Sequence, residues 1–367
     1  MPASKNVTSE LETTELEEVI MEQVFRARAP LRLGLAGGGT DVSPYSEASG
    51  GMVLNATIDL YAHAIIEPRN DGKVSFAAED LNESLVLDSC TQLPLDNALP
   101  LYCGIYNRIV AQYSQDTPLS FNLTTFADAP PGSGLGTSST MVVCVIRVFS
   151  EWLNLGLGEY EVAQLAYQIE RLDLSFAGGK QDQYAAAFGG FNFIEFGPGK
   201  ERVLVNPLRV KSWIKNELEI CTVLFYTGRS RDSAQIIQDQ IEMTTSNLSQ
   251  SNKAMDELKK NALEMKEAVL KGNLAQYADI LNRSWLHKKK LSNLVSNPHL
   301  DSIYQYALSS GAVSGKVSGA GGGGFFMFFV LPHNRMRLIK ALGDLEGKVI
   351  NFHFTQSGAE SWTRKVI

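Results

Sequence analysis

Hydrophobic and polar residues follow two spacings along the chain, and these spacings predict a mixture of strands and helices. The segments 25–37 and 120–130 alternate apolar and polar residues, which is typical of half-buried strands. The segment 139–155 has helical length and is apolar on most faces, so we predict a buried helix there, followed by a second helix at 159–173. The first half is also expected to contain strands at 52–68, 74–80, 83–88 and 189–196, and a helix at 101–114.

The second half of the chain opens with a predicted strand at 217–228 and continues in long polar helical segments over 233–271 and 274–295. The segment 307–330 predicts a strand, a glycine-rich loop and a second strand, and 347–354 predicts a late strand. Strands and helices do not alternate regularly, which favours the α+β class in both halves. The division that we predict is an acidic N-terminal extension at 1–24, an N-terminal domain at 25–205 and a C-terminal domain at 206–367.

Charge is spread unevenly, and most of the net negative charge lies in the N-terminal extension. The whole chain has a net charge of −7, while residues 1–24 hold six glutamates and one lysine. No basic excess is left that would favour binding of nucleic acid. The extension also contains Leu11, Leu16, Val19 and Ile20, so it is either a short helix or a frayed terminal segment.

The lack of recognisable targeting signals and the usage of cysteine predict a protein of the reducing cytoplasm. No uncharged apolar run reaches the roughly 18 residues that a membrane-spanning helix needs, so we expect no membrane partner. The N-terminus lacks a basic region followed by an apolar core, and therefore resembles no secretory signal. The four cysteines form no CxxC pair, and Cys144 and Cys221 lie in apolar runs that are typical of buried thiols.

The segment PPGSGLGTSSTM, residues 130–141, has the composition of a phosphate-binding loop. Three glycines alternate with other residues, and four hydroxyl-bearing residues follow in a row. Glycine lets backbone N–H groups turn toward an anion, and the N-terminus of the following helix adds partial positive charge. Serine and threonine at the helix start cap the helix and can contact phosphate or Mg²⁺. The segment therefore predicts a polyphosphate site, with a capped helix after a tight turn as the alternative.

Two other nucleotide motifs are excluded. The pattern GxxxxGK[ST] does not occur in the chain. The pattern GxGxxG does occur at Gly319, Gly321 and Gly324, but a predicted strand follows it in place of a helix, so the context of a dinucleotide-binding fold is missing.

Three segments together resemble the GHMP kinases, the superfamily of galactokinase, homoserine kinase, mevalonate kinase and phosphomevalonate kinase. The loop at 130–141 is similar to their nucleotide loop, 27–41 resembles their N-terminal substrate motif, and 316–329 resembles their C-terminal glycine motif. The resemblance implies a two-domain α+β fold. Its N-terminal domain would be like ribosomal protein S5 and its C-terminal domain would be ferredoxin-like.

Within the superfamily, the segments 31–45, 178–196 and 225–237 resemble the D-glycero-D-manno-heptose 7-phosphate kinases. Galactokinases usually carry GEHTD where this chain has GGGTD at 37–41, which argues against galactose. The resemblance implies ATP-dependent phosphorylation of the anomeric O1 of the heptose 7-phosphate, with Mg²⁺ as the metal and a homodimer as an allowed assembly. It also implies a place in making nucleotide-activated heptose for lipopolysaccharide, other surface polysaccharide or glycoprotein. Two alternatives stay open: a kinase of an unphosphorylated sugar such as fucose, and a non-catalytic sensor of sugar and nucleotide.

The resemblance also implies roles for individual residues. Asp182 matches the catalytic aspartate, which accepts a proton from the sugar hydroxyl or orients it, although it is otherwise a surface loop residue. Arg32 matches the cation that stabilises transferred charge, and is otherwise a solvated cation at a strand edge. Ser138 and Glu170 match the metal ligands, and Glu170 is otherwise a solvated helix residue. The residues expected to hold ATP are Pro131, Gly132, Ser133, Gly134, Leu135, Gly136, Thr137, Ser138 and Ser139.

Substrate contacts are expected from the first and third motifs and from cations near the sugar phosphate. Asp41 matches the aspartate that hydrogen-bonds sugar hydroxyls, and is otherwise a plain turn residue. The phosphate dianion of the substrate needs a cation, for which arginine is well suited. The run of lysines at 288–290 is interpreted as a solvated helix face. The residues expected to bind the sugar are Gly38, Gly39, Thr40, Asp41, Lys180, Arg229, Arg231, Ser233, Lys316, Gly321 and Gly322.

Overall fold

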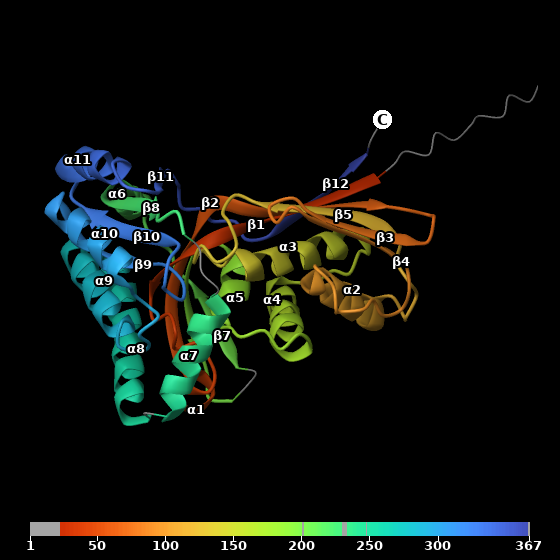
Figure 1. The fold of residues 1–367 in the computed structure, drawn as a ribbon, viewed down its shortest axis with the longest axis horizontal. Coiled ribbons are helices and arrows are strands. Elements are labelled where there is room, and N and C mark those ends of the chain that lie inside the picture. The colour runs from red at the N-terminus through yellow and green to blue at the C-terminus, as the bar shows by residue number, and fades with distance from the viewer. Residues whose placement is uncertain (1–22, 200–201, 230–232, 247, 366–367) are drawn as a thin grey trace, which may run out of the picture.

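Two β-sheets, each packed against helices, make up the protein (Figure 1). The computed structural model describes residues 23–199, 202–229, 233–246 and 248–365. The larger sheet has eight strands and the smaller sheet has four. The sheets are built mainly from antiparallel strands, so the α+β class predicted from the sequence is confirmed.

The larger sheet runs in the order β12-β1-β2-β5-β3-β4, and β6 joins it by pairing with β2 and β7. Its strand pairs are antiparallel except for β3 and β5, which run parallel. The strands are β1 (Gln23–Ala36), β2 (Gly51–Pro68), β3 (Lys73–Ala78), β4 (Glu83–Asp88), β5 (Phe121–Ala127), β6 (Phe191–Phe196), β7 (Val203–Pro207) and β12 (Glu360–Lys365).

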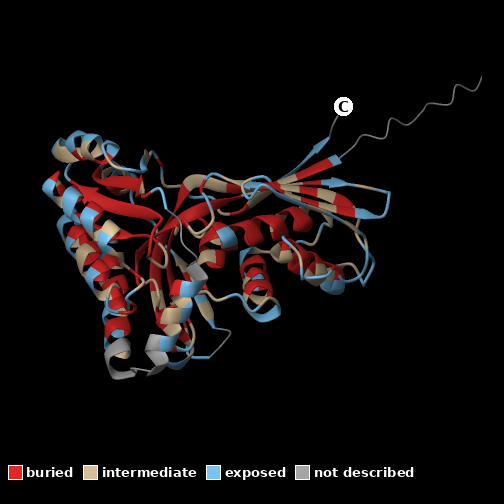
Figure 2. Cartoon of the chain, in the orientation of Figure 1, coloured by how far each residue is buried: buried red, intermediate tan, exposed pale blue. Residues whose placement is uncertain are grey.

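Helices cover one face of the larger sheet, as Figure 1 shows for α2 (Pro100–Tyr113), α3 (Thr137–Trp152) and α4 (Glu159–Tyr167). The helix α3 is buried along most of its length, which confirms the prediction from its apolar sequence (Figure 2). The helix α4 continues in a π-helical turn, η1 (Gln168–Asp173). Two shorter helices, α1 (Tyr45–Ser49) and α5 (Gln181–Phe188), complete this half.

The strand β1 changes the faces that it presents about halfway along. Ala29 belongs to the core that contains α3, whereas Leu31 belongs to a second core shared with the C-terminal helices. The register with β2 shifts between Pro30 and Arg32, which is the effect of a β-bulge. Arg32 therefore faces the side of the sheet that carries α3 and α5, while Arg28, in the regular part, has a side chain that is 41% exposed.

The smaller sheet has the order β11-β8-β10-β9, with strands β8 (Thr222–Tyr226), β9 (Ala312–Val317), β10 (Phe325–Val330) and β11 (Lys348–Ile350). The strand predicted at 217–228 is wrong in its first part, because helix α6 continues to residue 221 and β8 begins only after it. The amphipathic face of α6 packs Ile214 and Leu218 into the core, and this tertiary burial stabilises the helix. The helices are α6 (Ser212–Cys221), α7 (Ser233–Ser246), α8 (Leu248–Lys271), α9 (Leu274–Lys288), α10 (Pro298–Ser309) and α11 (Pro332–Gly343).

The chain crosses between the two sheets twice. The strand β7 spans 203–207, so the larger sheet extends slightly past the boundary predicted at residue 205. The last strand, β12, returns to pair with β1 in the larger sheet. Residues 1–22 of the predicted acidic extension lie outside the described residues, and its last two residues begin β1. In the described part of the chain, no helix has both the length and the apolar character needed to cross a membrane.

Candidate active site

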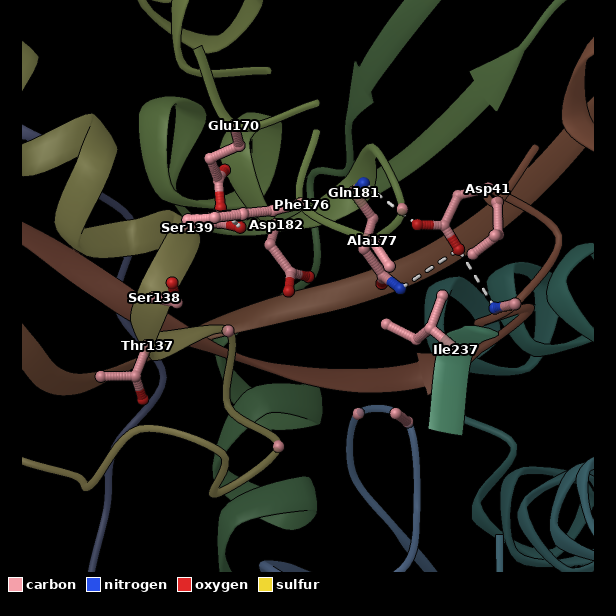
Figure 3. A pocket seen from close by; sticks show the side chains of 18 of the residues that line it. Asp41, Thr137, Ser138, Ser139, Glu170, Phe176, Ala177, Gln181, Asp182 and Ile237 are labelled. Atoms are coloured by element: carbon pink, nitrogen blue, oxygen red, sulfur yellow. Dashed lines mark hydrogen bonds between the residues drawn. The ribbon is translucent and has the colours of Figure 1, made fainter. Parts of the chain in front are cut away.

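A cavity of about 500 Å³ opens beside the N-terminal end of α3, with walls from both halves of the chain (Figure 3). Three predicted groups of residues meet in it: the nucleotide loop, the first-motif residues and the predicted catalytic and metal residues. The predicted site residues that line the cavity are Arg32, Gly39, Asp41, Pro131, Gly132, Gly134, Gly136, Thr137, Ser138, Ser139, Glu170 and Asp182.

The alternating glycines of the nucleotide loop have a direct conformational explanation. Gly132, Gly134 and Gly136 have φ angles of 73°, 86° and 79°, a region that favours glycine. A Cβ at Gly136 would lie 3.1 Å from the carboxyl group of Asp182, so a larger residue would crowd this side chain. The serine or threonine cap expected from the sequence is wrong, because the N-cap residue of α3 is Gly136 and no side-chain cap is found among the described residues. Ser138 is exposed at the cavity. The loop therefore presents the positive end of a 16-residue helix to the cavity.

The nucleotide loop rests on the glycine loop between β9 and β10. The backbone N–H of Phe325 donates a 2.9 Å hydrogen bond to the carbonyl oxygen of Ser133. A Cβ at Gly319 would lie 2.5 Å from the Cα of Gly134, and a Cβ at Gly134 would overlap the carbonyl oxygen of Ser318. Glycine at both positions thus allows two backbones to touch, and we call this contact the loop seam.

Arg32 and Asp182, which both line the cavity, form a bidentate ion pair. Nε and Nη2 of Arg32 donate to the two carboxylate oxygens of Asp182 at 2.7 and 2.8 Å. Nη1 of Arg32 donates to the carbonyl oxygen of Gly134 at 2.5 Å, which ties the pair to the nucleotide loop. The Arg32 side chain is 4% exposed, so this cation is buried and is not a solvated strand-edge residue. The geometry fixes the direction of the Asp182 carboxylate.

Asp41 connects the first motif to the start of α5. Its Oδ2 accepts hydrogen bonds from the backbone N–H groups of Lys180 and Gln181 at 3.0 and 3.2 Å. Its Oδ1 accepts from the backbone N–H of Gly39 at 3.1 Å and from Nε2 of Gln181 at 3.4 Å. Asp41 is buried, and these contacts place it on the wall opposite the nucleotide loop (Figure 3).

Glu170 lies in a buried polar network on η1. Its Oε1 accepts from the hydroxyl of Ser139 at 2.9 Å, and its Oε2 accepts from Nε2 of Gln183 at 2.6 Å. Burial raises the pKa of Glu170, while the nearby Arg171 guanidinium, at 3.5 Å, and the two hydrogen bonds act in the opposite direction. Glu170 is therefore a buried carboxylate at the cavity wall and not a solvated helix residue.

The donor chemistry of Ser138 and Glu170 is compatible with Mg²⁺. Both supply hard oxygen atoms at the cavity beside the nucleotide loop. In the part of the chain that the structure describes, no group of three or more His, Cys, Asp or Glu residues could hold a metal. Mg²⁺ commonly takes one or two protein oxygens together with substrate phosphates and water, so a site with few protein ligands fits it.

Several predicted substrate residues lie elsewhere in the structure. The Lys316 side chain donates to the carbonyl oxygen of Gly34 at 2.8 Å, and burial lowers its pKa well below the usual value. The Lys180 ammonium lies 5.5 Å above the ring of Tyr167, and the Thr40 hydroxyl donates to the carbonyl oxygen of Gly37 at 2.8 Å. The predicted and described residues that are absent from the lining of the cavity are Gly38, Thr40, Ser133, Leu135, Lys180, Arg229, Lys316, Gly321 and Gly322.

The predicted cations of the sugar phosphate are not brought to this cavity by the described structure. Arg229 is exposed, its guanidinium lies 3.4 Å from Glu346, and together with Gly322 it lines a second cavity of about 230 Å³. Arg231 and the side chain of Ser233 lie outside the described residues.

Lys288 is a site residue that sequence reasoning missed. It is 5% exposed, it lines the cavity, and its Nζ donates a hydrogen bond to the carbonyl oxygen of Gly319. The prediction of a solvated face at 288–290 is wrong for this residue, although Lys290 is exposed. Burial lowers the pKa of Lys288 to about 8. A signal was present, because Lys288 follows the buried Leu281 and Trp285 at helical spacing.

Comparison with known proteins connects this site to a family. The N-terminal domain of the GHMP kinases matches residues 101–190, and the C-terminal domain of the GHMP kinases matches residues 265–344. A D-glycero-alpha-D-manno-heptose 7-phosphate kinase from Campylobacter jejuni is 50% identical over 340 residues, which cover 93% of this chain and 99% of that protein. An L-fucokinase/L-fucose-1-P guanylyltransferase from Bacteroides fragilis is 26% identical over 91% of this chain, but the match covers 37% of that protein.

A solved structure gives the same result. The crystal structure of a D-glycero-D-manno-heptose 1-phosphate kinase from Bacteriodes thetaiotaomicron superposes with a TM-score of 0.78 at 46% identity, and the match covers 92% of this chain and 98% of that one. The two matched domains, the shared fold and the high identity over nearly the whole chain agree with the three sequence motifs that meet in the cavity. The chain belongs to the GHMP kinases.

Proposed function

We propose that the protein transfers the γ-phosphoryl group of ATP to the anomeric O1 hydroxyl of D-glycero-D-manno-heptose 7-phosphate, giving the 1,7-bisphosphate and ADP. The observation that carries this proposal is the Asp182 carboxylate, held by Arg32 in the cavity into which the nucleotide loop opens. The relative from Campylobacter jejuni, which is named for this sugar phosphate, supports the choice of substrate.

Asp182 is the group proposed to handle the proton of the acceptor hydroxyl. As the sugar O1 forms its bond to the γ-phosphorus, the O1 proton moves to the carboxylate, and the bond between the γ-phosphorus and the bridging oxygen of ADP breaks. Arg32 keeps the carboxylate in a fixed direction through its two short hydrogen bonds. Proton transfer of this kind depends on such alignment, because the carboxylate must meet the hydroxyl within hydrogen-bonding distance.

The nucleotide loop is proposed to hold the phosphates of ATP. The first turn of α3 has backbone N–H groups without an intrahelical acceptor, and Thr137 and Ser138 place hydroxyl groups at the same cavity wall. Donors that are fixed before the reaction stabilise the negative charge of the transferring group without needing to reorganise. Mg²⁺ is proposed to lie beside Ser138 and Glu170, where it would neutralise phosphate charge when bound.

The acceptor sugar is proposed to lie on the opposite wall, against Gly39 and Asp41. Asp41 is already oriented by four N–H donors, and the longest of these contacts, from Nε2 of Gln181 at 3.4 Å, is the one that a sugar hydroxyl would replace. In this proposal the sugar would lie between Asp41 and the nucleotide loop, with its reacting hydroxyl beside Asp182, which lines the same cavity (Figure 3).

The names of the relatives differ in the position of the phosphate on the substrate. One is named as a heptose 7-phosphate kinase and another as a heptose 1-phosphate kinase, and a more distant one is named as a fucokinase. The test is therefore release of ADP from ATP and Mg²⁺ with heptose 7-phosphate, heptose 1-phosphate, free heptose, fucose, mannose and galactose, with Asp182→Asn as a control.

Turnover confined to heptose 7-phosphate, and lost in Asp182→Asn, is the expected result. Turnover of heptose 1-phosphate or a free sugar would reject the proposed substrate while leaving the chemistry in place. No turnover of any sugar by a protein that binds ATP would favour the sensor interpretation.

We also propose that the protein works in the reducing cytoplasm and that two copies form a homodimer. The location is supported by the free thiols of Cys90, Cys103, Cys144 and Cys221. Analytical ultracentrifugation tests the homodimer by the mass of the sedimenting species.

A further inference from the structure

Lys288 brings a buried ammonium group to the cavity, and the reaction described above gives it no role. An ammonium group carries three N–H donors. Within the described residues, Nζ of Lys288 donates one hydrogen bond, to the carbonyl oxygen of Gly319. Because Lys288 lines the cavity while only 5% of it is exposed, its other donors are available to a ligand bound there.

The ammonium group lies between the nucleotide loop and the substrate motif. On one side, its partner Gly319 contacts Gly134 of the nucleotide loop through the loop seam. On the other side, a Cβ at Gly38 of the first motif would lie 3.9 Å from Nζ of Lys288. A group that passes from ATP to the sugar has to cross the space between these two motifs, and Asp182 lines the same space.

The other cations near the cavity have protein partners. Arg32 binds both oxygens of Asp182 and the carbonyl oxygen of Gly134. Arg171 lies 3.5 Å from Glu170 and donates to backbone carbonyl groups and to Ser139. Among the described residues that line the cavity, Lys288 is therefore the cation with the fewest protein acceptors.

The surroundings of Lys288 make its positive charge costly until an anion binds. Burial and repulsion from Arg32 lower the pKa of Lys288 to about 8, and attraction by Asp41 and Asp182 opposes this change only in part. Charged groups under such strain are concentrated at functional sites, where the charge meets a ligand of opposite sign. A phosphoryl group with its spread of negative charge is a ligand of this kind.

We propose that Lys288 contacts an oxygen of the phosphoryl group in transit between ATP and the sugar and stabilises its negative charge. The inference rests on the proposed kinase function. Lys288 forms no covalent bond and takes up no proton in this role, since the proton of the sugar hydroxyl goes to Asp182.

The test compares Lys288→Met with Lys290→Met, which removes the same charge from an exposed position two residues later. We expect Lys288→Met to lower kcat by about 10²-fold, the size of effect seen when one preorganised donor is removed. The loss should be equal for heptose 7-phosphate and for any free sugar that the protein accepts. A higher Tm than that of the wild type would show that the loss of activity does not come from unfolding. Lys290→Met should behave as the wild type.

Calorimetry supplies a readout that does not depend on the sugar. Lys288→Met should bind the β,γ-imido analogue of ATP at least several-fold more weakly than the wild type, and should bind ADP equally well. If Lys288→Met matches Lys290→Met both in its kinetics and in its binding of the analogue, the inference is overturned. So would a loss confined to the phosphorylated sugar, because Lys288 would then bind the phosphate of the acceptor. If the wild type turns over no sugar, the kinase proposal fails in that assay, while the comparison of ADP with the analogue still decides the role of Lys288.

Discussion

The loop seam predicts that a single methyl group at Gly319 will disturb nucleotide binding. In Gly319→Ala, the new Cβ would lie 2.5 Å from the Cα of Gly134. Carbon atoms prefer a separation of roughly 3.5–4.0 Å, so the two loops must move apart by about 1 Å. Gly319 also has a φ angle of 74°, where an L-residue costs about 1–2 kcal/mol. Overpacking adds about 1–3 kcal/mol, so unfolding should become easier by about 2–5 kcal/mol in total.

The matched control is Gly72→Ala. Gly72 has a φ angle of 70°, and a Cβ built there meets no atom within 4 Å. This variant therefore carries the backbone strain of about 1–2 kcal/mol without the steric contact. The difference between the two variants, in free energy of unfolding and in kcat/KM for ATP, isolates the effect of pushing the glycine loop away from the nucleotide loop.

Urea unfolding and ADP-release kinetics measure the two consequences. Gly72→Ala should keep the wild-type kcat/KM for ATP, whereas Gly319→Ala should lose about 10²-fold, because a displacement near 1 Å is enough for such a loss. The reasoning is refuted if both variants unfold at the same urea concentration and both keep the wild-type kcat/KM for ATP. In that case the loop seam would be a contact that neither stabilises the protein nor positions ATP.

Three further predictions concern the charged residues of the cavity. Asp182→Asn should lower kcat by about 10²–10⁴-fold, and an unchanged kcat would remove Asp182 from the reaction. The same variant should lower the free energy of unfolding by about 1–3 kcal/mol, because the buried Arg32 loses its partner while Asp182 is partly exposed. Glu170→Gln should raise the Mg²⁺ concentration needed for half-maximal activity by about tenfold, as measured by titration of the metal at saturating ATP, and an unchanged titration would exclude Glu170 as a ligand. Lys288→Met should raise the free energy of unfolding at pH 7 by about 2–3 kcal/mol, because the wild type must keep a charged ammonium whose pKa is about 8 instead of 10.5. The folded wild type binds the Lys288 proton less tightly than the unfolded chain does, so its free energy of unfolding should rise between about pH 8 and pH 10.5, and Lys288→Met should lack this rise. Urea unfolding at pH 7 and pH 10 measures the free energy of unfolding of both proteins. An equal change with pH in the two proteins would contradict the prediction.

The local features of the chain were predictable where one rule decided the outcome. The glycines and hydroxyls at 130–141 predicted a turn that leads into a helix start, and the structure has this arrangement, with positive φ angles at Gly132, Gly134 and Gly136. The buried helix α3 followed from its apolar faces alone. The strand predicted at 217–228 was partly wrong, because the buried face of α6 stabilises a helix through contacts with distant segments.

The candidate site was predictable in its residue types but only partly in its membership. Asp182, Asp41 and the nucleotide loop carry short motifs, and all of them line the cavity except for Ser133 and Leu135 of the loop. Lys316 belongs to a similar motif, yet its side chain points to the carbonyl oxygen of Gly34. Lys288 carries no motif, and its helical spacing from Leu281 and Trp285 was the one sign that it shares their buried face while Lys290 stays exposed. Sequence distance says nothing about which of several cations reaches a shared cavity.

The sequence by itself determined that β1 is a strand with alternating character, and only the tertiary structure decided where its arginines point. Regular alternation places Arg28 and Arg32 on the same face, since they are four residues apart. The register shift between Pro30 and Arg32 reverses the faces, so that Arg28 remains partly exposed and Arg32 turns to Asp182. A β-bulge depends on the partner strand and on the bodies packed against both faces, and these contacts are long-range. The alternating pattern records the local preference of the chain, and the long-range packing determines the face on which the ion pair of Arg32 and Asp182 forms.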